Sequence, residues 1–534
     1  MKRIFILFFI LLFTASFVSA GAVQPIGSSL LKSGTFGMWV DDYDRMQRTE
    51  DFSKLKSLVS VGLDTAYWDS NGISFGIAYD KLAIGKLIFL GRYIPGVNST
   101  DSENLEEGIN NFAFSTVESN GSPVNKIDNS TVVLGAGFGI GTIGIMYAVE
   151  LANNYEESSV IYNNVYKSNS ITVYKNSTTD YDKILDNNSI THIFEAGVSV
   201  GKLKPQLQVR LNSANSDNDN NYIRSYTTTY DGTKDQKKTS VSESVYSGPA
   251  INNSSSLLNN YESIKYMDLI FAPEVKYGLT KKIALYLGGE IDLRSIDDNS
   301  YYKVSTNYTS YYTTGANDGK ISSYSSTVDS YKINQKSYND FSIYLKAKYK
   351  FNFSDKVFAG VYPGYTLSYL GFTYELARTT VSVTKTDANS DGVISASETT
   401  TITTTGDNDS VEYTDIKHKI SLPFAVKWII SKVVSLRLGV KWDFTLESKS
   451  VKQIDVSNGT KSVTVTGSNS TVNYPIARST EVSYTQTTFS MSSKSMYFGA
   501  GINVSDNFRI DLLSTVTSKL DLTSSYAVQA TFNF

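Results

Sequence analysis

Apolar and polar residues alternate one by one along many segments of this chain. The segment 434–447 shows the pattern most fully, because its even positions carry apolar side chains and most of its odd positions carry polar or charged ones. The segments 203–213, 282–295 and 338–353 repeat the pattern. Because successive side chains of a β-strand point to opposite faces, the alternation predicts strands with one apolar and one polar face.

The same pattern, followed along the whole chain, predicts sixteen strands. They lie near 57–68, 72–82, 85–93, 130–139, 142–152, 189–200, 203–213, 263–278, 282–295, 338–353, 356–372, 415–430, 433–447, 487–502, 507–517 and 524–534. In an alternative that also gives sixteen, Thr35–Asp44 is a strand and 72–93 is one long strand. Tyrosine and threonine are abundant and proline is scarce, which is typical of all-β chains.

The connections between these strands alternate between short and long. Short ones lie near 139–141, 201–204, 279–282, 354–356, 431–432 and 505–507, and long polar ones near 94–129, 153–188, 214–262, 296–337, 373–414 and 448–486. A soluble β-sandwich would show the same alternation of side chains, but it has no reason to sort its loops by length. A transmembrane antiparallel β-barrel does, because its periplasmic turns are short and its extracellular loops are long.

Both ends of the chain support the barrel. The last strand places Tyr526, Val528 and Phe532 on one face and ends on Phe534, and it resembles the C-terminal signal of bacterial outer-membrane β-barrels. The start of the chain, a basic Met1-Lys2-Arg3 followed by an apolar run and small residues, is typical of a signal peptide at 1–20. The resemblance implies a place in the cell outer membrane, in contact with its lipid and with loops exposed on the cell surface.

The remaining sequence divides into an N-terminal segment and a barrel. We expect residues 21–56 to form a periplasmic segment, a first strand or a plug, and residues 57–534 to form the barrel with its extracellular loops. After residue 21 no run approaches the roughly 20 apolar residues that a membrane helix needs. Cysteine is absent, which excludes disulfides and thiolate metal sites, and a net charge of −3 gives no basic footprint for nucleic acid.

A barrel of sixteen strands encloses water, so its polar face should line a channel. The pore-lining residues that we predict are Arg210, Glu290, Asp292, Arg294, Lys346, Lys348, Lys350, Arg437, Lys441 and Asp443. Cations gather between 338 and 447 and acids between 268 and 292, which is similar to the charged walls of general diffusion porins. The alternative is that these charges only solvate the wall or pair with their neighbours.

The sequence therefore predicts a porin-like channel for passive diffusion of small hydrophilic solutes. Porins are commonly trimers, which makes a homotrimer the expected assembly if the chain oligomerises. One alternative is an adhesin-like surface protein whose loops bind host or surface partners. Another is a transporter of a hydrophobic substrate, plugged by residues 21–56. We expect no enzymatic activity, since His192 and His418 fall on the apolar faces of their strands.

One predicted loop carries a calcium motif. Residues 387–398 match D-x-[DN]-x-[DN]-G-x5-E, and they resemble the calcium loops of EF-hand and dockerin proteins over these twelve positions. The expected ligands are the side chains of Asp387, Asn389, Asp391 and Glu398, the Val393 carbonyl, and Ser395 directly or through water. The flanking residues are β-branched rather than helical, so a bound calcium would stiffen a hairpin tip. The alternative is an accidental polar turn in a chain rich in Asp, Asn and Ser.

Overall fold

The computed structural model describes most of the strands and part of the N-terminal segment. The described residues are 38–39, 45–46, 48–64, 72–94, 110–112, 115–117, 124–167, 172–231, 240–247, 263–297, 300–311, 315–317, 320–395, 398–406, 409–456, 459–465, 468–471, 479–491, 495–516 and 526–534. The predicted signal peptide at 1–20 and most of the alternative strand at 35–44 lie outside them.

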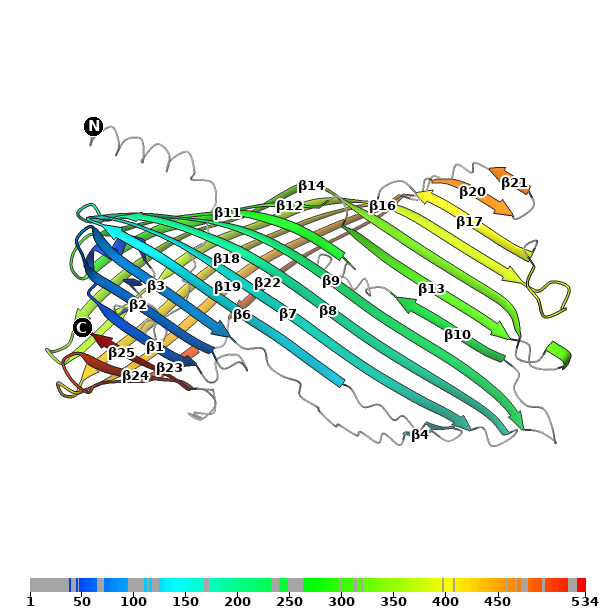
Figure 1. The fold of residues 1–534 in the computed structure, drawn as a ribbon, viewed down its shortest axis with the longest axis horizontal. Helices are drawn as coiled ribbons and strands as arrows, with labels where there is room; N and C mark the ends of the chain where they lie inside the picture. The colour runs from blue at the N-terminus through cyan, green and yellow to red at the C-terminus, as the bar shows by residue number, and fades with distance from the viewer. Residues whose placement is uncertain are drawn as a thin grey trace.

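Within the described residues, sixteen strands pair antiparallel to form a closed barrel (Figure 1). The ring runs through β1 (Leu58–Asp64), β2 (Gly72–Leu82), β3 (Gly85–Ile94), β6 (Val124–Ile140), β7 (Ile143–Lys167), β8 (Thr172–Val198), β9 (Leu203–Asp231), β11 (Ser263–Gly278), β12 (Ile283–Ile296), β14 (Ile321–Asn352), β15 with β16 (Val357–Val361 and Gly364–Thr386), β18 (Asp409–Ile429), β19 (Val434–Val456), β22 with β23 (Ser479–Met491 and Ser495–Asn503), β24 (Phe508–Val516) and β25 (Tyr526–Asn533). The ring closes where β1 pairs with both β2 and β25.

The predicted fold class and strand count are confirmed. The alternative in which 72–93 is one strand is wrong, because β2 and β3 pair with each other around a tight turn in which Leu82 lies opposite Gly85. Two strands of the ring are interrupted: β15 and β16 both pair with β14 and β18, and β22 and β23 both pair with β19. Each interrupted pair therefore counts as one position in the ring.

The wall is apolar outside and polar inside, the reverse of a soluble domain. Phe194 exposes 51% of its surface, whereas the next residue, Glu195, exposes 3%. Leu134 and Ile145 are exposed in the same way, and Gln208 is fully buried. The alternation in the sequence therefore assigns side chains to the correct faces. The apolar residues of the alternating pattern lie on the outer surface and do not pack against one another in a core.

No helix in the described part of the chain is long and apolar enough to cross a membrane.

The long connections differ from the expected loops, because much of their length is β-structure. β8, β9 and β14 contain 27, 29 and 32 residues, although about 9–11 residues suffice to cross a bilayer. The extra length pairs into hairpins beyond the barrel, where β10 (Ser240–Ser247), β13 (Tyr301–Tyr311), β17 (Thr399–Gly406), β20 (Gly459–Val465) and β21 (Ser468–Thr471) join the sheet (Figure 1). Threonine and tyrosine in these segments favour strands, whereas the polarity of the segments had suggested loops.

The inverted wall predicts that a charge on the outer face is costly within the apolar belt and harmless beyond it. Phe194→Arg should destabilise the barrel by about 2–4 kcal/mol, the usual cost of a basic residue at mid-membrane depth. Asn188→Arg, on the same strand and the same exposed face but past the belt, is the matched control and should change stability by less than about 1 kcal/mol. Urea unfolding of both variants in lipid vesicles measures the difference, and equal stabilities would contradict this orientation.

Candidate functional site

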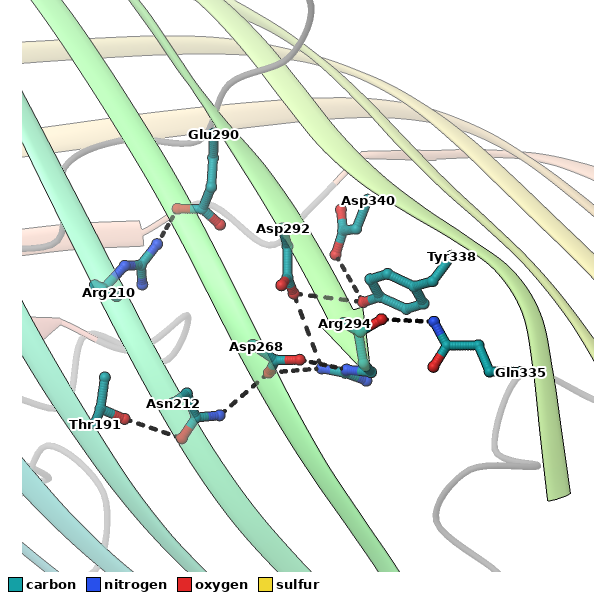
Figure 2. A network of polar contacts seen from close by, with 10 residues as sticks. All are labelled: Thr191, Arg210, Asn212, Asp268, Glu290, Asp292, Arg294, Gln335, Tyr338 and Asp340. Carbon is teal, nitrogen blue, oxygen red and sulfur yellow. Dashed lines mark hydrogen bonds and ion pairs between the residues drawn. The ribbon is translucent and has the colours of Figure 1, made fainter. Parts of the chain in front are cut away.

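A chain of polar contacts crosses the inner face of the wall from β8 to β14 (Figure 2). Asp268 on β11 lies opposite Arg294 on β12, and its carboxylate accepts bonds from Arg294 Nε at 2.7 Å and Nη2 at 3.1 Å. On its other side, Asn212 Nδ2 donates to Asp268 at 3.2 Å, and Thr191 Oγ1 donates to Asn212 at 3.1 Å. These contacts form because antiparallel pairing brings opposite residues close together on one face.

Arg294 is the centre of this network. Its guanidinium lies 4.3 Å from the ring centre of Tyr266 and 4.9 Å from that of Tyr338, close enough for cation–π attraction to both. Gln335 fixes the backbone beside it, since its side chain accepts from the Ile296 N–H at 2.9 Å and donates to the Arg294 carbonyl at 2.5 Å. The network is thus anchored to both side chains and backbone.

Carboxylates outnumber cations in this network. Asp292 lies 3.9 Å from Arg294 and accepts a weak bond from the Tyr338 hydroxyl at 3.5 Å, while its Oδ1 is buried and has no hydrogen-bond partner among the described residues. The same hydroxyl donates to Asp340 at 3.4 Å. Glu290 is ion-paired with Arg210. This part of the inner wall is therefore acidic.

The neighbouring part of the wall is basic. On β18 and β19, Lys417 pairs with Glu447 at 2.8 Å, and both Lys419 and Lys441 pair with Asp443, at 3.0 and 2.8 Å. β14 contributes Lys346, whose ammonium lies 3.9 Å from the ring centre of Tyr344, and Lys348, 5.6 Å from that of Tyr362. Since β11, β12, β14, β16, β18 and β19 are consecutive in the ring, the acidic and basic regions adjoin each other and do not face each other across the lumen.

The N-terminal segment lies inside the barrel at the end that carries the short turns. Its 3-10 helix, η1 (Thr49–Lys54), is fixed by polar contacts with the inner wall. The Thr49 N–H donates to Glu195 at 3.1 Å, Arg48 is ion-paired with Glu274, and Asp51 is ion-paired with Lys204. These wall residues come from β8, β11 and β9, so the segment bridges several strands.

A small apolar core holds the same segment. Phe52 packs where the wall carries only glycine: a Cβ at Gly137 or Gly139 would lie 2.9 Å from Phe52, and one at Gly144 would collide with the Thr49 carbonyl. Around it, the described apolar side chains Met46, Phe52, Leu55, Leu58, Ala78, Ile88, Leu90, Val133, Met146, Ala148 and Ile193 form one buried cluster. The lumen is thus filled by protein on the β1–β9 side at this end.

A second buried cluster lines the wall on the side of the network away from the turns. It contains Ile264, Ile296, Ile333, Phe372, Tyr374, Val411 and Tyr413. Phe372 packs on Tyr374 and on Tyr413, with ring centres 4.9 Å apart in both pairs. Toward the turn end, the inner wall therefore carries first this apolar and aromatic cluster, then the charged networks, and finally the N-terminal segment.

All of the predicted pore-lining residues belong to the inward-facing set. The structure brings together Arg210 with Glu290, Asp292 with Arg294, and Lys441 with Asp443, while Arg437 pairs with Asp511 at 2.5 Å. Sequence reasoning missed the sites where η1 docks. Two features of the sequence could have indicated them: the glycines at alternate positions of 135–141 and the unbroken apolar run 87–90. Both leave an inner face that is free of polar side chains and suited to contact with an apolar segment.

The predicted calcium loop has an ordered conformation. Gly392 and Ser390 have positive φ values of 80° and 61°. Asp387 accepts bonds from the Asp391 and Gly392 N–H groups at 3.2 and 2.6 Å. Glu398 accepts hydrogen bonds from the Ala388 and Ser395 N–H groups, each at 2.8 Å. These bonds lower the pKa of Glu398, and the bond from Ser395 has the largest effect.

The carboxylates of this loop point to backbone donors. Among the described residues, no group of three or more His, Asp or Glu side chains converges as metal ligands would. A bound cation would have to replace these internal bonds.

The two histidines lie on the outer face. His192 and His418 each bond a tyrosine hydroxyl at 2.8 Å, Tyr147 and Tyr365 respectively. Both therefore point away from the lumen and its charged residues, as the alternation predicts.

Comparison with known proteins gives distant likenesses. No protein-family model matches the chain, and no curated protein matches its sequence. The chain is similar to the structure of the P. putida toluene transporter TodX, at 8% identity and a TM-score of 0.33, over 96% of this chain and 99% of that one. The Ralstonia pickettii toluene transporter TbuX is 9% identical with a TM-score of 0.32, over 96% of this chain and 99% of that one. A mutant of the Pseudomonas aeruginosa ferric enterobactin receptor PfeA is 9% identical with a TM-score of 0.24, over 91% of this chain and 84% of that one.

The network around Arg294 predicts a measurable coupling energy. Asp268 is 2% exposed, so Asp268→Asn should destabilise the barrel by about 3 kcal/mol, because the largely buried guanidinium of Arg294 loses its bidentate carboxylate and keeps only the more distant Asp292. Adding Arg294→Gln should recover part of this loss. Urea unfolding of both single variants and the double variant gives the coupling, which should exceed about 0.5 kcal/mol. Strictly additive losses would show that the pair does not interact.

Proposed function

We propose that this protein is an outer-membrane transport barrel for small hydrophilic solutes, closed at its turn end by the N-terminal segment. The observation that carries the proposal is the inverted wall, with an apolar exterior around a charged interior that holds η1. The exterior favours lipid as its surroundings, and a closed ring leaves no unpaired strand edge there. We therefore place the barrel in the outer membrane, with the short turns on the periplasmic side.

The charged interior favours a polar solute over a hydrophobic one. Arg294, Asp292 and Lys441 lie at mid-height on strands whose opposite face meets the apolar belt. A hydrophobic substrate that passed these groups would displace their water without replacing its hydrogen bonds. A channel for small hydrophilic solutes, as predicted from the sequence, therefore stays the preferred function, with the difference that the N-terminal segment obstructs the channel at its periplasmic end.

The way η1 is held favours a gate over a permanent plug. Its polar contacts are ion pairs and single hydrogen bonds to separate strands, so no strand has to leave the ring when they break. Each of these contacts exists only while η1 is docked. Losing one should therefore lower the population of the closed state relative to the open state. Lys204 and Glu274 supply the wall side of two of these contacts.

Planar bilayer recordings test this proposal. Lys204→Gln combined with Glu274→Gln should raise the open probability by roughly tenfold or more, because two charge-assisted contacts of the closed state are lost. Lys419→Gln, which removes an inner-wall charge that does not touch η1, is the control and should leave the open probability within about twofold. A wild-type protein and a double variant that both insert without any conductance would refute transport through the lumen.

The hairpins beyond the membrane support a second candidate function, surface binding. β14 pairs with β16 from Lys346 to Ser323, far more than a bilayer requires. This ordered polar sheet could present tyrosines and threonines to a partner. It is compatible with transport, because the two functions use different parts of the chain.

We also propose that residues 387–398 bind calcium. The positive φ angles at Ser390 and Gly392 give the loop the sharp turn that a calcium loop needs. The Asn317 side chain donates to the Ser390 carbonyl at 2.7 Å and so connects the loop to the neighbouring hairpin. Bound calcium would stiffen this loop, and the hydrogen bond from Asn317 would transmit the stiffening to the neighbouring hairpin. The affinity expected of an extracellular module is weak, with a Kd of about 10⁻⁴–10⁻³ M.

Calcium titration calorimetry tests the loop. Glu398→Gln should weaken calcium binding at least about tenfold, since it removes the carboxylate that closes the coordination shell. Glu412→Gln, an exposed acid on β18, should bind calcium like the wild type. Identical titrations of the two variants, or no calcium heat in the wild type, would exclude this site.

A further inference from the structure

Among the residues that the structure describes, a group of four positive charges at the turn end of the lumen makes ion pairs with only one carboxylate, that of Asp511. Lys350 on β14, Lys427 on β18, Arg437 on β19 and Arg509 on β24 all belong to the inward-facing set. Arg437 and Arg509 share one oxygen of Asp511, at 2.5 and 2.8 Å. Within the described chain, Lys350 and Lys427 have no ion pair.

Strand pairing brings these side chains to one place. Lys427 lies opposite Arg437 on β19 and opposite Phe358 on β15, and Lys350 lies opposite Gly360 on the same β15. The two lysines therefore flank β15 on its inner side, two strand spacings apart across the sheet and two residues apart along it, or roughly 12 Å between their Cα atoms. Lys427 is within electrostatic range of the cations Lys350, Arg437 and Arg509 and of the Asp511 carboxylate.

These charges face the lumen and not the lipid. The residues next to the two lysines, Tyr349 and Trp428, expose 44% and 49% of their surface on the outer face. Lys350 and Lys427 are themselves only half-buried, so a solute in the lumen can reach them. The Met38 side chain of the N-terminal segment packs against Gly360, which lies opposite Lys350.

Electrostatics argues that such a group should hold a counter-ion. Taking several cations partly out of water without matching carboxylates is unfavourable, and an anion with several oxygens can compensate two or three of them at once. Chloride can accept hydrogen bonds from lysine and arginine, but it carries one charge on one atom and therefore cannot compensate several separated cations at once. A phosphate or a small dicarboxylate matches both the charge and the donors.

We propose that Lys350, Lys427 and the Arg437–Asp511–Arg509 group form a binding site for a small oxyanion at the turn end of the lumen. The site deepens the proposed function, because it names an anionic solute class for the passage. Its existence does not depend on conduction, since the binding can be measured in detergent without a membrane.

Calorimetry with inorganic phosphate on the full chain in detergent micelles tests the site. The wild type should show saturable binding that succinate reduces by competition and that potassium chloride at equal ionic strength does not abolish. Lys350→Gln with Lys427→Gln should weaken phosphate binding at least about tenfold, because two charge-assisted bonds are lost. Lys427→Arg, which keeps the charge, should retain binding within a few-fold and guards against a folding defect.

The matched control removes the same two charges from the same end of the barrel. Lys356→Gln with Lys432→Gln changes exposed lysines on the turns that follow β14 and β18, and it should leave phosphate affinity within twofold. Equal weakening by the two double variants would show a general charge effect and overturn the site, as would the absence of saturable binding in the wild type. Phosphate binding without any bilayer conductance would leave the site standing and remove the transport function.

Discussion

The pairing of β1 with β25 is the constraint on which the rest of this structure depends. It satisfies the last free strand edges, so every backbone donor and acceptor in the ring can bond to a neighbouring strand. Once the ring is closed, side chains have only two directions, and the strand period assigns each residue to lipid or to lumen. The same constraint makes Phe194 exposed and Glu195 buried although they are adjacent.

Closure also explains why polar groups on the inner wall pair across strands. A carboxylate on a lumen-facing position has cross-strand neighbours on both sides, as Asp268 has Arg294 and Asn212. Those neighbours are set by register, and a one-residue slip would turn each of them to the lipid. The ion pairs therefore add specificity to the register, even where desolvation offsets much of their attraction.

Sequence alone predicted the strands, their number and the side of the wall on which Arg210, Lys346 or Asp443 lies, because these follow from a period of two. It did not predict which charges meet, since Arg210 and Glu290 are brought together by register over 80 positions. It named a plug as one of three readings of residues 21–56, but it did not predict where η1 docks in the lumen. The first strands were the hardest to assign because Ile88 and Leu90 are apolar on the inner face, and that departure from alternation is explained by the apolar side chains of the N-terminal segment.

The interior charges differ in what they can do for a solute. Lys441 and Asp443 satisfy each other at 2.8 Å, so a passing ion must compete with an existing bond. Lys350 and Lys427 have no carboxylate partner among the described residues, and an anion gains their attraction without breaking a pair. Under the proposed function, an anion bound at Lys350 and Lys427 would lie beside the segment that obstructs the lumen and would change the charge that this segment meets. Which solute the barrel recognises would then follow from the charges that the register leaves without partners among the described residues.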